Sequence, residues 1–303
     1  MDTNLLQNRI KKGIKEWLEV LPYIAIGLIL VFVFVFYPLF KNFYISVTEY
    51  TIIPGAESPF VGIENYKQIF NDDKFYYAFR NSVLMVLVTV PTQIIFGVVL
   101  AYIIDNARKG KTFFKTAYYI PVITSWIVVS YIFKYIFAGG KGGFMNYILM
   151  NLHIISEPIG WFQNTWTALA VTWILSIWKG IGWCMIIYIA GLQGIPKMLY
   201  ESAALDGASE YQKFRFITIP QLAPITFFIL INLTIGAFNS FIQTYILTNG
   251  APMNTTHVMM SLMYARAFQN FEFGIASAMG VLQGAVILCI IIFQKWVIKK
   301  SER

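Results

Sequence analysis

Residues 200–220 of the 303-residue chain read YESAALDGASEYQKFRFITIP, a polar stretch between two long apolar segments. The pattern predicts two short helices that meet at a glycine. Pro196 suits the first position of the first helix, where its missing N–H removes no hydrogen bond. Gly207, which follows Asp206, supplies the residue that turns the chain at the end of that helix.

The second helix is predicted to begin at Ser209. Ser209 and Gln212 fit the capping box, in which a hydroxyl and an amide three residues later each accept a hydrogen bond from a free backbone N–H. Pro220 is predicted to limit the far end of this helix. The result is a helix–glycine–helix hairpin with exposed charges, a shape suited to being gripped by a soluble partner.

The composition is far too apolar for a soluble domain. Hydrophobic residues make up 57% of the chain and charged residues 13%, whereas soluble proteins average about 25% charged residues. We therefore predict an integral membrane protein. The two cysteines and two histidines lack the spacing of a metal site or a disulfide framework, so neither a metal site nor a catalytic residue is expected.

Six apolar runs are long enough to cross a membrane: residues 21–40, 83–104, 117–137, 166–190, 224–247 and 275–293. At about 1.5 Å per residue, each nearly or fully spans a hydrocarbon core of about 30 Å. The first run exceeds the apolar core of a secretory signal and no A-x-A cleavage pattern follows it, so we expect a retained helix. The predicted fold class is all-α, a polytopic membrane protein with six transmembrane helices.

Lysine and arginine set the predicted orientation. With both termini inside, 15 of the 23 basic residues fall on the inner face and six on outer loops and helix edges, which agrees with the positive-inside rule. The net charge of +8 therefore argues for orientation in a membrane and against a nucleic-acid partner. The hairpin, in a loop at about 195–222, is predicted to lie in the cytoplasm. The expected division is a cytoplasmic tail at 1–20, a first transmembrane helix at 21–43, an extracytoplasmic loop at 44–78, a core of five helices at 79–298 and a cytoplasmic tail at 299–303.

Several spans carry polar groups in mid-run, among them Gln93, Asn232 and Gln283. Amides and freed backbone groups are costly against lipid, so their faces should turn toward protein or a water-filled cavity. No span carries Asp or Glu in its middle, which counts against coupling to a proton or sodium gradient. The chain also has no G-x-x-x-x-G-K-[ST] run, so nucleotide binding in such a loop is excluded and the energy source must lie in another protein.

The hairpin resembles the EAA loop of permease subunits in binding-protein-dependent ABC importers. Glu201, Ser202 and Ala203 come first, then Gly207, then residues 217–220, which read ITIP. Serine at 202 replaces the usual alanine and isoleucine at 219 replaces the usual leucine; both departures are mild because size or polarity is kept. Further matches to carbohydrate-importing permeases are FVGIENY at 60–66, RNS at 80–82, LTNGAP at 247–252 and FG at 273–274.

This resemblance covers roughly residues 20–298 and implies the type I permease fold of ABC importers, in the cytoplasmic membrane. It implies four kinds of partner: membrane lipids, a second homologous permease, two cytoplasmic ABC ATPase subunits and an extracytoplasmic solute-binding protein. No cofactor is expected in this chain, since ATP and Mg would be bound by the ATPase subunits. The residues implied in coupling to the ATPase are Glu201 as ion-pairing anchor, Ala203 as point of close approach, Gly207 as the turn, and Ser202, Asp206, Ile217 and Pro220.

Aromatic and amide residues in the fourth and fifth spans are candidates for a solute path. Asn239 and Gln243 are four residues apart and are predicted to share a helix face. Sugars bind to stacked rings and to amides, so this set suits a saccharide, and ordinary helix packing is the alternative. The resemblance also implies a role for four residues. In the permeases that the chain resembles, the positions that match Gly180, Trp183, Phe238 and Asn239 lie at or near the transported sugar. The complete candidate set is Trp178, Lys179, Gly180, Trp183, Phe238, Asn239 and Gln243.

Lys179 is the basic residue nearest the middle of an apolar run, and two interpretations stay open. In the first interpretation its role is structural: the ammonium pairs with a backbone carbonyl or lies over the ring of Trp178 or Trp183. In the second it lines the solute path and meets a carboxylate or hydroxyls on the solute.

The predicted function is that of a permease subunit that moves a sugar or oligosaccharide by alternating access. The alternatives are an ion-coupled secondary transporter, an ABC permease for a non-sugar solute such as a glycerophosphodiester, and a membrane scaffold or channel subunit.

Overall fold

The computed structural model describes residues 17, 19–53, 55 and 57–301, so most of the predicted tail at 1–20 and the last two residues of the predicted tail at 299–303 lie outside the described residues. The described part of the chain is helical and contains no β-sheet, only an isolated bridge between Thr48 and Phe60. Within it, five helices are long and apolar enough to cross a membrane, and a bent pair of shorter helices passes the same test together, as a sixth candidate span. The all-α prediction with six transmembrane spans is confirmed.

The first span, Glu19–Ser46, passes through the π-helical turn η1 (Phe32–Phe36) and ends with α2 (Tyr37–Ser46). The other helices follow in chain order: α3 (Glu64–Phe70), α4 (Asp73–Asn106), α5 (Lys111–Ile123), α6 (Trp126–Ile136), α7 (Phe144–Asn151), α8 (Thr165–Gln193), α9 (Lys197–Leu205), α10 (Glu210–Lys213), η2 (Phe214–Thr218), α11 (Ile219–Gln221), α12 (Ala223–Phe238), α13 (Ile242–Leu247), α14 (Met259–Tyr264), η3 (Ala265–Gln269) and α15 (Phe273–Ser301).

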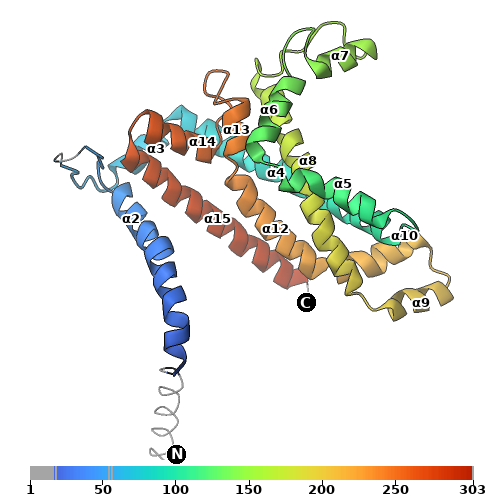
Figure 1. Cartoon of the computed structure of the whole chain (residues 1–303). Helices are drawn as coiled ribbons and strands as arrows, with labels where there is room; N and C mark the ends of the chain where they lie inside the picture. The colour runs from blue at the N-terminus through green and yellow to red at the C-terminus, as the bar shows by residue number, and fades with distance from the viewer. Residues whose placement is uncertain (1–16, 18, 54, 56, 302–303) are drawn as a thin grey trace, which may run out of the picture.

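The long helices α4, α8, α12 and α15 form the body of the molecule, and α5 lies beside α8 (Figure 1). The hairpin of α9 and α10 lies at one end, called here the hairpin end, and α3, α7 and α14 lie toward the far end. The first span projects away from the body, and 0% of its most apolar stretch is buried by the rest of the described chain. It meets the body through α2, which contacts α15.

The third span differs from its prediction. Instead of one helix at 117–137, α5 and α6 meet at an angle of 95°. The two residues between them, Thr124 and Ser125, have extended backbone angles with ψ of 144° and 134°. An extended pair cannot continue a helical hydrogen-bond ladder, so the span turns there and leaves the last carbonyls of α5 without helical partners.

The RNS motif at 80–82 fastens the loop after α13 to α4 at the far end. The Asn81 side-chain amide donates to the carbonyl oxygens of Thr255 and His257 at 2.7 and 2.8 Å. The Ser82 hydroxyl accepts from the backbone N–H of Met259 at 2.9 Å. All three bonds join residues more than 170 positions apart, so this short motif closes the bundle at its far end.

The motifs at 60–66 and 273–274 make a second fastening at the same end. The Asn65 amide donates to the carbonyl oxygens of Ser46 and Thr48 at 2.9 and 3.0 Å. Gly274 allows α15 to start beside them, because a Cβ at this position would overlap the Thr48 carbonyl oxygen. The end of the first span is thereby held against the start of the last.

The hairpin has the predicted turn and capping box. Gly207 adopts φ of +77°, a region that strains residues with a Cβ. The Ser209 hydroxyl accepts from the Gln212 N–H at 3.3 Å, and the Gln212 side chain accepts from the Ser209 N–H at 2.7 Å. Pro196 is predicted at the first position of this helix; in the structure it is the N-cap of α9, one position before the first helical residue, Lys197.

Pro220 does not end the second hairpin helix, contrary to its prediction. The chain continues in helical turns from α10 through η2 and α11 toward α12, with the Ile219 N–H bonded to the Phe214 carbonyl across the π-helical turn. Proline has no N–H to donate to the preceding turn, and a wider turn at this point accommodates that loss. The hairpin is therefore joined to α12 by a nearly continuous helical segment.

Replacing Asn81 by alanine should destabilise the far end. The His257 carbonyl would lose its donor in a buried site and the Thr255 carbonyl in a partly buried one, at up to about 1 to 3 kcal/mol for each group left unpaired. Thermal unfolding of the detergent-purified protein measures the loss. Asn151→Ala, at an exposed position on α7, is the matched control and should leave the midpoint unchanged. Equal midpoints for the two variants would contradict the fastening role.

Candidate functional site

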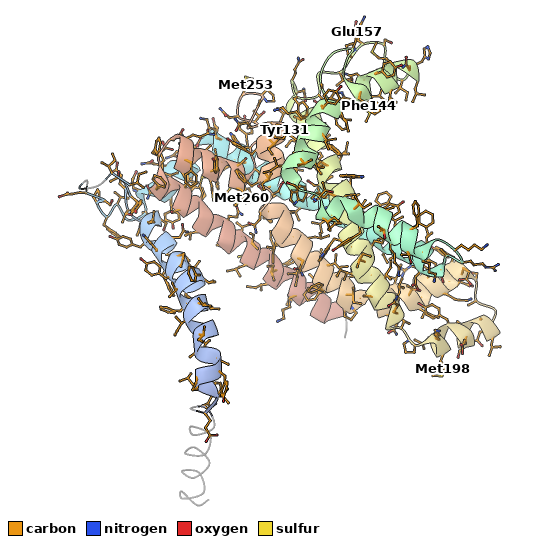
Figure 2. All side chains as sticks on the ribbon, in the orientation of Figure 1. Tyr131, Phe144, Glu157, Met198, Met253 and Met260 are labelled. Carbon is orange, nitrogen blue, oxygen red and sulfur yellow. The ribbon has the colours of Figure 1, made fainter. Side chains whose placement is uncertain are left out.

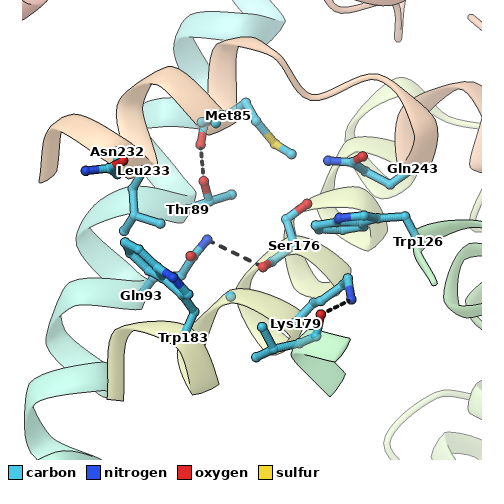
Figure 3. Close-up of a pocket in the computed structure, with 14 residues that line it drawn as sticks. Met85, Thr89, Gln93, Trp126, Ser176, Lys179, Trp183, Asn232, Leu233 and Gln243 are labelled. Carbon is cyan, nitrogen blue, oxygen red and sulfur yellow. Dashed lines mark hydrogen bonds between the residues drawn. The ribbon is translucent and has the colours of Figure 1, made fainter. Parts of the chain in front are cut away.

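A half-open pocket of about 230 Å³ lies among α4, α8 and α12, beside the break between α5 and α6 (Figure 3). Two indole rings, Trp126 and Trp183, lie on two sides of it. The lining residues are Met85, Thr89 and Gln93 of α4, Val122 of α5, Trp126 of α6, Ser176, Lys179, Gly180 and Trp183 of α8, Asn232, Leu233, Gly236 and Ala237 of α12, and Gln243 of α13.

Neutral polar side chains face this pocket from three helices. The Gln93 amide donates to the Ser176 carbonyl oxygen at 3.4 Å and so links α4 to α8 at the pocket wall. Gly180 makes room for that amide, since a Cβ at this position would overlap the Gln93 side chain. None of the described residues that line the pocket carries a carboxylate. The pocket therefore offers rings, amides and hydroxyls to whatever enters.

Lys179 lies at the edge of the pocket, and its side chain is only 3% exposed. Its ammonium donates to the carbonyl oxygens of Pro121, Val122 and Thr124 at 2.5, 3.1 and 2.5 Å. It also lies 4.9 Å from the centroid of the Trp126 ring. The structure agrees with the interpretation in which Lys179 pairs with backbone carbonyls, but the ring beneath it is Trp126 and not Trp178 or Trp183.

Four of the seven predicted path residues come together in the pocket: Lys179, Gly180, Trp183 and Gln243. The other three do not line it. Trp178 is 45% exposed on another face of α8, where its ring packs against Phe133 at 5.6 Å. Phe238 is packed in the interior at 1% exposure.

Asn239 lies outside the pocket because the helix ends there. The prediction that Asn239 and Gln243 share a helix face is wrong, since α12 stops at Phe238 and α13 starts at Ile242. Gln283 of α15 donates to the Phe238 carbonyl oxygen at 3.3 Å and to the Asn239 side-chain oxygen at 3.1 Å, and so holds this break in place. Asn239 itself is exposed.

Some pocket residues carry no individual signal in the sequence. Gln93 and Asn232 stand out as polar groups in apolar runs, but Thr89, Ser176 and Trp126 do not. A threonine or serine inside a helix normally bonds to the carbonyl four residues earlier, as Thr89 and Ser176 do here. Only the packing of three helices shows that these side chains face one cavity.

The hairpin forms a second candidate site, on the surface. A shallow hollow of about 300 Å³ is lined by Ala203, Asp206, Gly207, Ala208, Gln212, Lys213, Phe216 and Ile217. Leu205, at the hairpin tip, is 90% exposed, and Met198 points away from the bundle (Figure 2). Glu201, Ser202 and Pro220 are exposed as well. Four of the seven predicted coupling residues, Ala203, Asp206, Gly207 and Ile217, thus line one hollow, and the other three are exposed outside it.

The hairpin is fastened to the bundle through α10. The Tyr102 hydroxyl of α4 donates to the Glu210 carboxylate at 3.2 Å, and the rings of Tyr102 and Phe214 lie 4.7 Å apart. Lys213 also donates to Glu210, and this bond lowers the pKa of that carboxyl below its usual value. The hairpin therefore has one fixed side toward α4 and one free side toward solvent.

The family model described as "Binding-protein-dependent transport system inner membrane component" matches residues 93–303, more than two thirds of the chain. The chain belongs to this family. The resemblance to importer permeases, drawn from the hairpin and the short motifs, is thereby confirmed, and this permease is a membrane component of a transport system.

Relatives of the permease cover most of its length. It is 33% identical over 259 residues to the lactose transport system permease protein LacF of Rhizobium radiobacter, covering 84% of each chain. It is 31% identical over 290 residues to the trehalose/maltose transport system permease protein MalF of Thermococcus litoralis, covering 95% of each. A crystal structure of a bacterial ABC transporter involved in import of the acidic polysaccharide alginate contains a chain with the same fold. The TM-score is 0.85 at 20% identity, over 97% of this permease and 100% of that chain.

Adding a methyl group at Gly180 should change the pocket without unfolding the permease. The Cβ of Gly180→Ala would displace the flexible end of Gln93 and break its bond to Ser176. We expect normal amounts of protein and a rise of about tenfold in the half-saturation concentration for uptake, the effect of losing one positioned polar contact. Gly284→Ala on α15, where a Cβ meets nothing within 4 Å, is the control. Unchanged uptake by Gly180→Ala would show that this pocket does not take part in transport.

Proposed function

We propose that this permease carries a sugar or oligosaccharide across the cytoplasmic membrane as the transmembrane subunit of an ATP-driven ABC importer. The observation that carries the proposal is the pocket, in which two indole rings lie near amides and hydroxyls from α4, α8 and α12. Apolar sugar faces stack on such rings, and sugar hydroxyls exchange hydrogen bonds with such neutral groups. The names of the relatives, which refer to lactose, trehalose and maltose, support the same class of solute.

The hairpin is proposed as the contact with the ATPase subunits, which would bind ATP and Mg. Leu205 supports this role, because an apolar side chain 90% exposed at the tip of a polar hairpin favours a protein partner. Glu201 would pair with a cation of the ATPase, and Ala203 would allow close approach.

Coupling would run along the helical segment from α10 to α12. That segment starts at the hairpin and ends in the helix that supplies Asn232, Leu233 and Gly236 to the pocket. Closure of the ATPases would move the hairpins, and nearly continuous helix would transmit that motion to the pocket wall. The pocket would then open alternately to either side of the membrane.

Two further partners complete the proposed importer. A solute-binding protein would dock at the far end, where α7 and its loops project from the body and expose Phe144 and Tyr147. A second homologous permease would close the open side of the pocket. The first span, unburied along its apolar stretch, would then face lipid or this second permease.

Reconstitution tests the whole proposal. The four-subunit complex in proteoliposomes, with the binding protein on one side, should take up radiolabelled lactose or maltose when ATP is supplied on the other side. Uptake should persist when ionophores abolish ion gradients. Ion-driven uptake without ATP would instead favour a secondary transporter.

Replacing Gly207 by proline should uncouple ATP hydrolysis from uptake. Proline fixes φ near −65°, whereas Gly207 requires +77°, so the turn between α9 and α10 cannot keep its shape. Gly55→Pro is the matched control, because Gly55 has φ of +83° and lies outside the hairpin. We expect uptake to fall at least about tenfold in Gly207→Pro, with protein still inserted, and to be kept in Gly55→Pro. Equal uptake by both variants would show that the hairpin does not couple ATP hydrolysis to transport.

The proposed orientation places both termini and the hairpin in the cytoplasm. A single cysteine introduced at Gly142, in the loop before α7, should react with an impermeant thiol reagent added to intact cells. A cysteine at Ser209 should react only after the cells are opened. The reverse pattern would refute this orientation.

A further inference from the structure

The broken third span creates an electrostatic problem at the pocket. Because α5 ends at Ile123, its last carbonyls have no N–H partners within the helix. These carbonyls are buried or partly buried among the spans, so leaving them unpaired would be costly. In the structure, a side chain from another helix donates hydrogen bonds to these carbonyls.

Lys179 of α8 supplies the missing donors. An ammonium group has three N–H bonds and no acceptor. All three point to backbone carbonyls at the end of α5, those of Pro121, Val122 and Thr124, at 2.5, 3.1 and 2.5 Å. Lys179 thus acts as a C-terminal cap delivered from a neighbouring helix, and none of its hydrogens is left for a solute.

The same ammonium also contacts the other side of the bend. Trp126 is the first residue of α6, directly after the break, and its ring centroid lies 4.9 Å from the Lys179 nitrogen. Cation–π attraction over an indole is strongest where water is excluded. One buried cation therefore links the end of α5 to the start of α6 and holds Trp126 at the pocket wall, facing the side formed by Gln93 and Trp183 (Figure 3).

We propose that Lys179 is a positioning residue: it fixes the bend between α5 and α6 and thereby holds the Trp126 ring as one wall of the solute pocket. Solute then binds to Trp126 and the neutral groups, and not to the lysine. The part of this inference that concerns solute rests on the proposed function. The part that concerns the bend does not.

Cysteine labelling tests the bend without any solute. The permease complex would carry Val122→Cys as its single cysteine, with Cys184 and Cys289 replaced by alanine, and N-ethylmaleimide would be the probe. Val122 lines the pocket beside the break. Lys179→Met, which keeps the length of the side chain but donates nothing, should change the labelling rate about tenfold.

Two variants control this experiment. Lys179→Arg keeps the charge and the donors and should label at the rate of the parent. Lys134→Met removes another lysine that donates to a helix-end carbonyl, that of Ile246 at 3.0 Å, but away from the pocket, and it should also leave the rate unchanged. If Lys179→Met does not accumulate in membranes, Lys179→Gln, with two donors, should give an intermediate rate. A parental rate in the inserted Met or Gln variant would overturn the proposal.

A double-mutant cycle tests whether Lys179 acts through Trp126. In reconstituted complex, Lys179→Met and Trp126→Ala should each raise the half-saturation concentration for lactose or maltose, with smaller effects on the maximal rate. The double variant should match Trp126→Ala alone, because groups that act through each other are not additive. Effects that multiply would show that Lys179 acts independently and would overturn the proposal. If neither disaccharide is transported, the proposed solute class fails while the labelling result still decides the role of Lys179.

Discussion

Close backbone contact between α8 and its neighbours is the constraint on which the rest of the structure depends. Gly97 of α4 faces α8 so closely that a Cβ there would lie 2.5 Å from the Cβ of Cys184. On α8, Gly182 faces the Tyr118 carbonyl of α5, and a Cβ would overlap it. Lipid provides little hydrophobic force between helices, so small residues that permit close packing are what hold such helices together. With α4 and α5 held against α8, the polar side chains of α4 and α8 meet at one pocket, beside Val122 of α5.

The second constraint is that every buried backbone group needs a partner where water is absent. Two spans are broken, between α5 and α6 and between α12 and α13, and each break is held by a long polar side chain from a neighbouring helix. Lys179 serves the first and Gln283 the second. A residue that lines the pocket follows each break closely: Trp126 after the first and Gln243 after the second. A break that is fastened in this way can shape a binding site while the helices around it stay in the membrane.

The shape of the hairpin is determined in a different way, because the hairpin lies outside the apolar spans. Its shape comes from local rules: the capping box at Ser209 and Gln212, the left-handed glycine at 207, and the π-helical turn before Pro220. Its position comes from the contacts of Tyr102 of α4 with Glu210 and Phe214, from the packing of Leu199 and Tyr200 against the buried core, and from helical continuity with α12. A locally rigid element on a continuous helix is what long-range mechanical coupling requires.

The sequence by itself determined the membrane class, the six spans, and the turn and cap of the hairpin. These depend on composition, on run length and on residues within four positions of each other, all of which are local quantities. The sequence also pointed to Lys179, Gly180, Trp183 and Gln243, because charged, amide and aromatic residues stand out in apolar runs and because the resemblance to sugar permeases implied Gly180 and Trp183. It failed at the 95° bend, at the helix end beside Asn239 and at Pro220, where partners distant in the chain or a wider helical turn offset the local pattern. Only the tertiary structure decided that Thr89, Ser176 and Trp126 share one cavity and that the charge of Lys179 serves the backbone of α5, because both facts depend on which helix faces lie together.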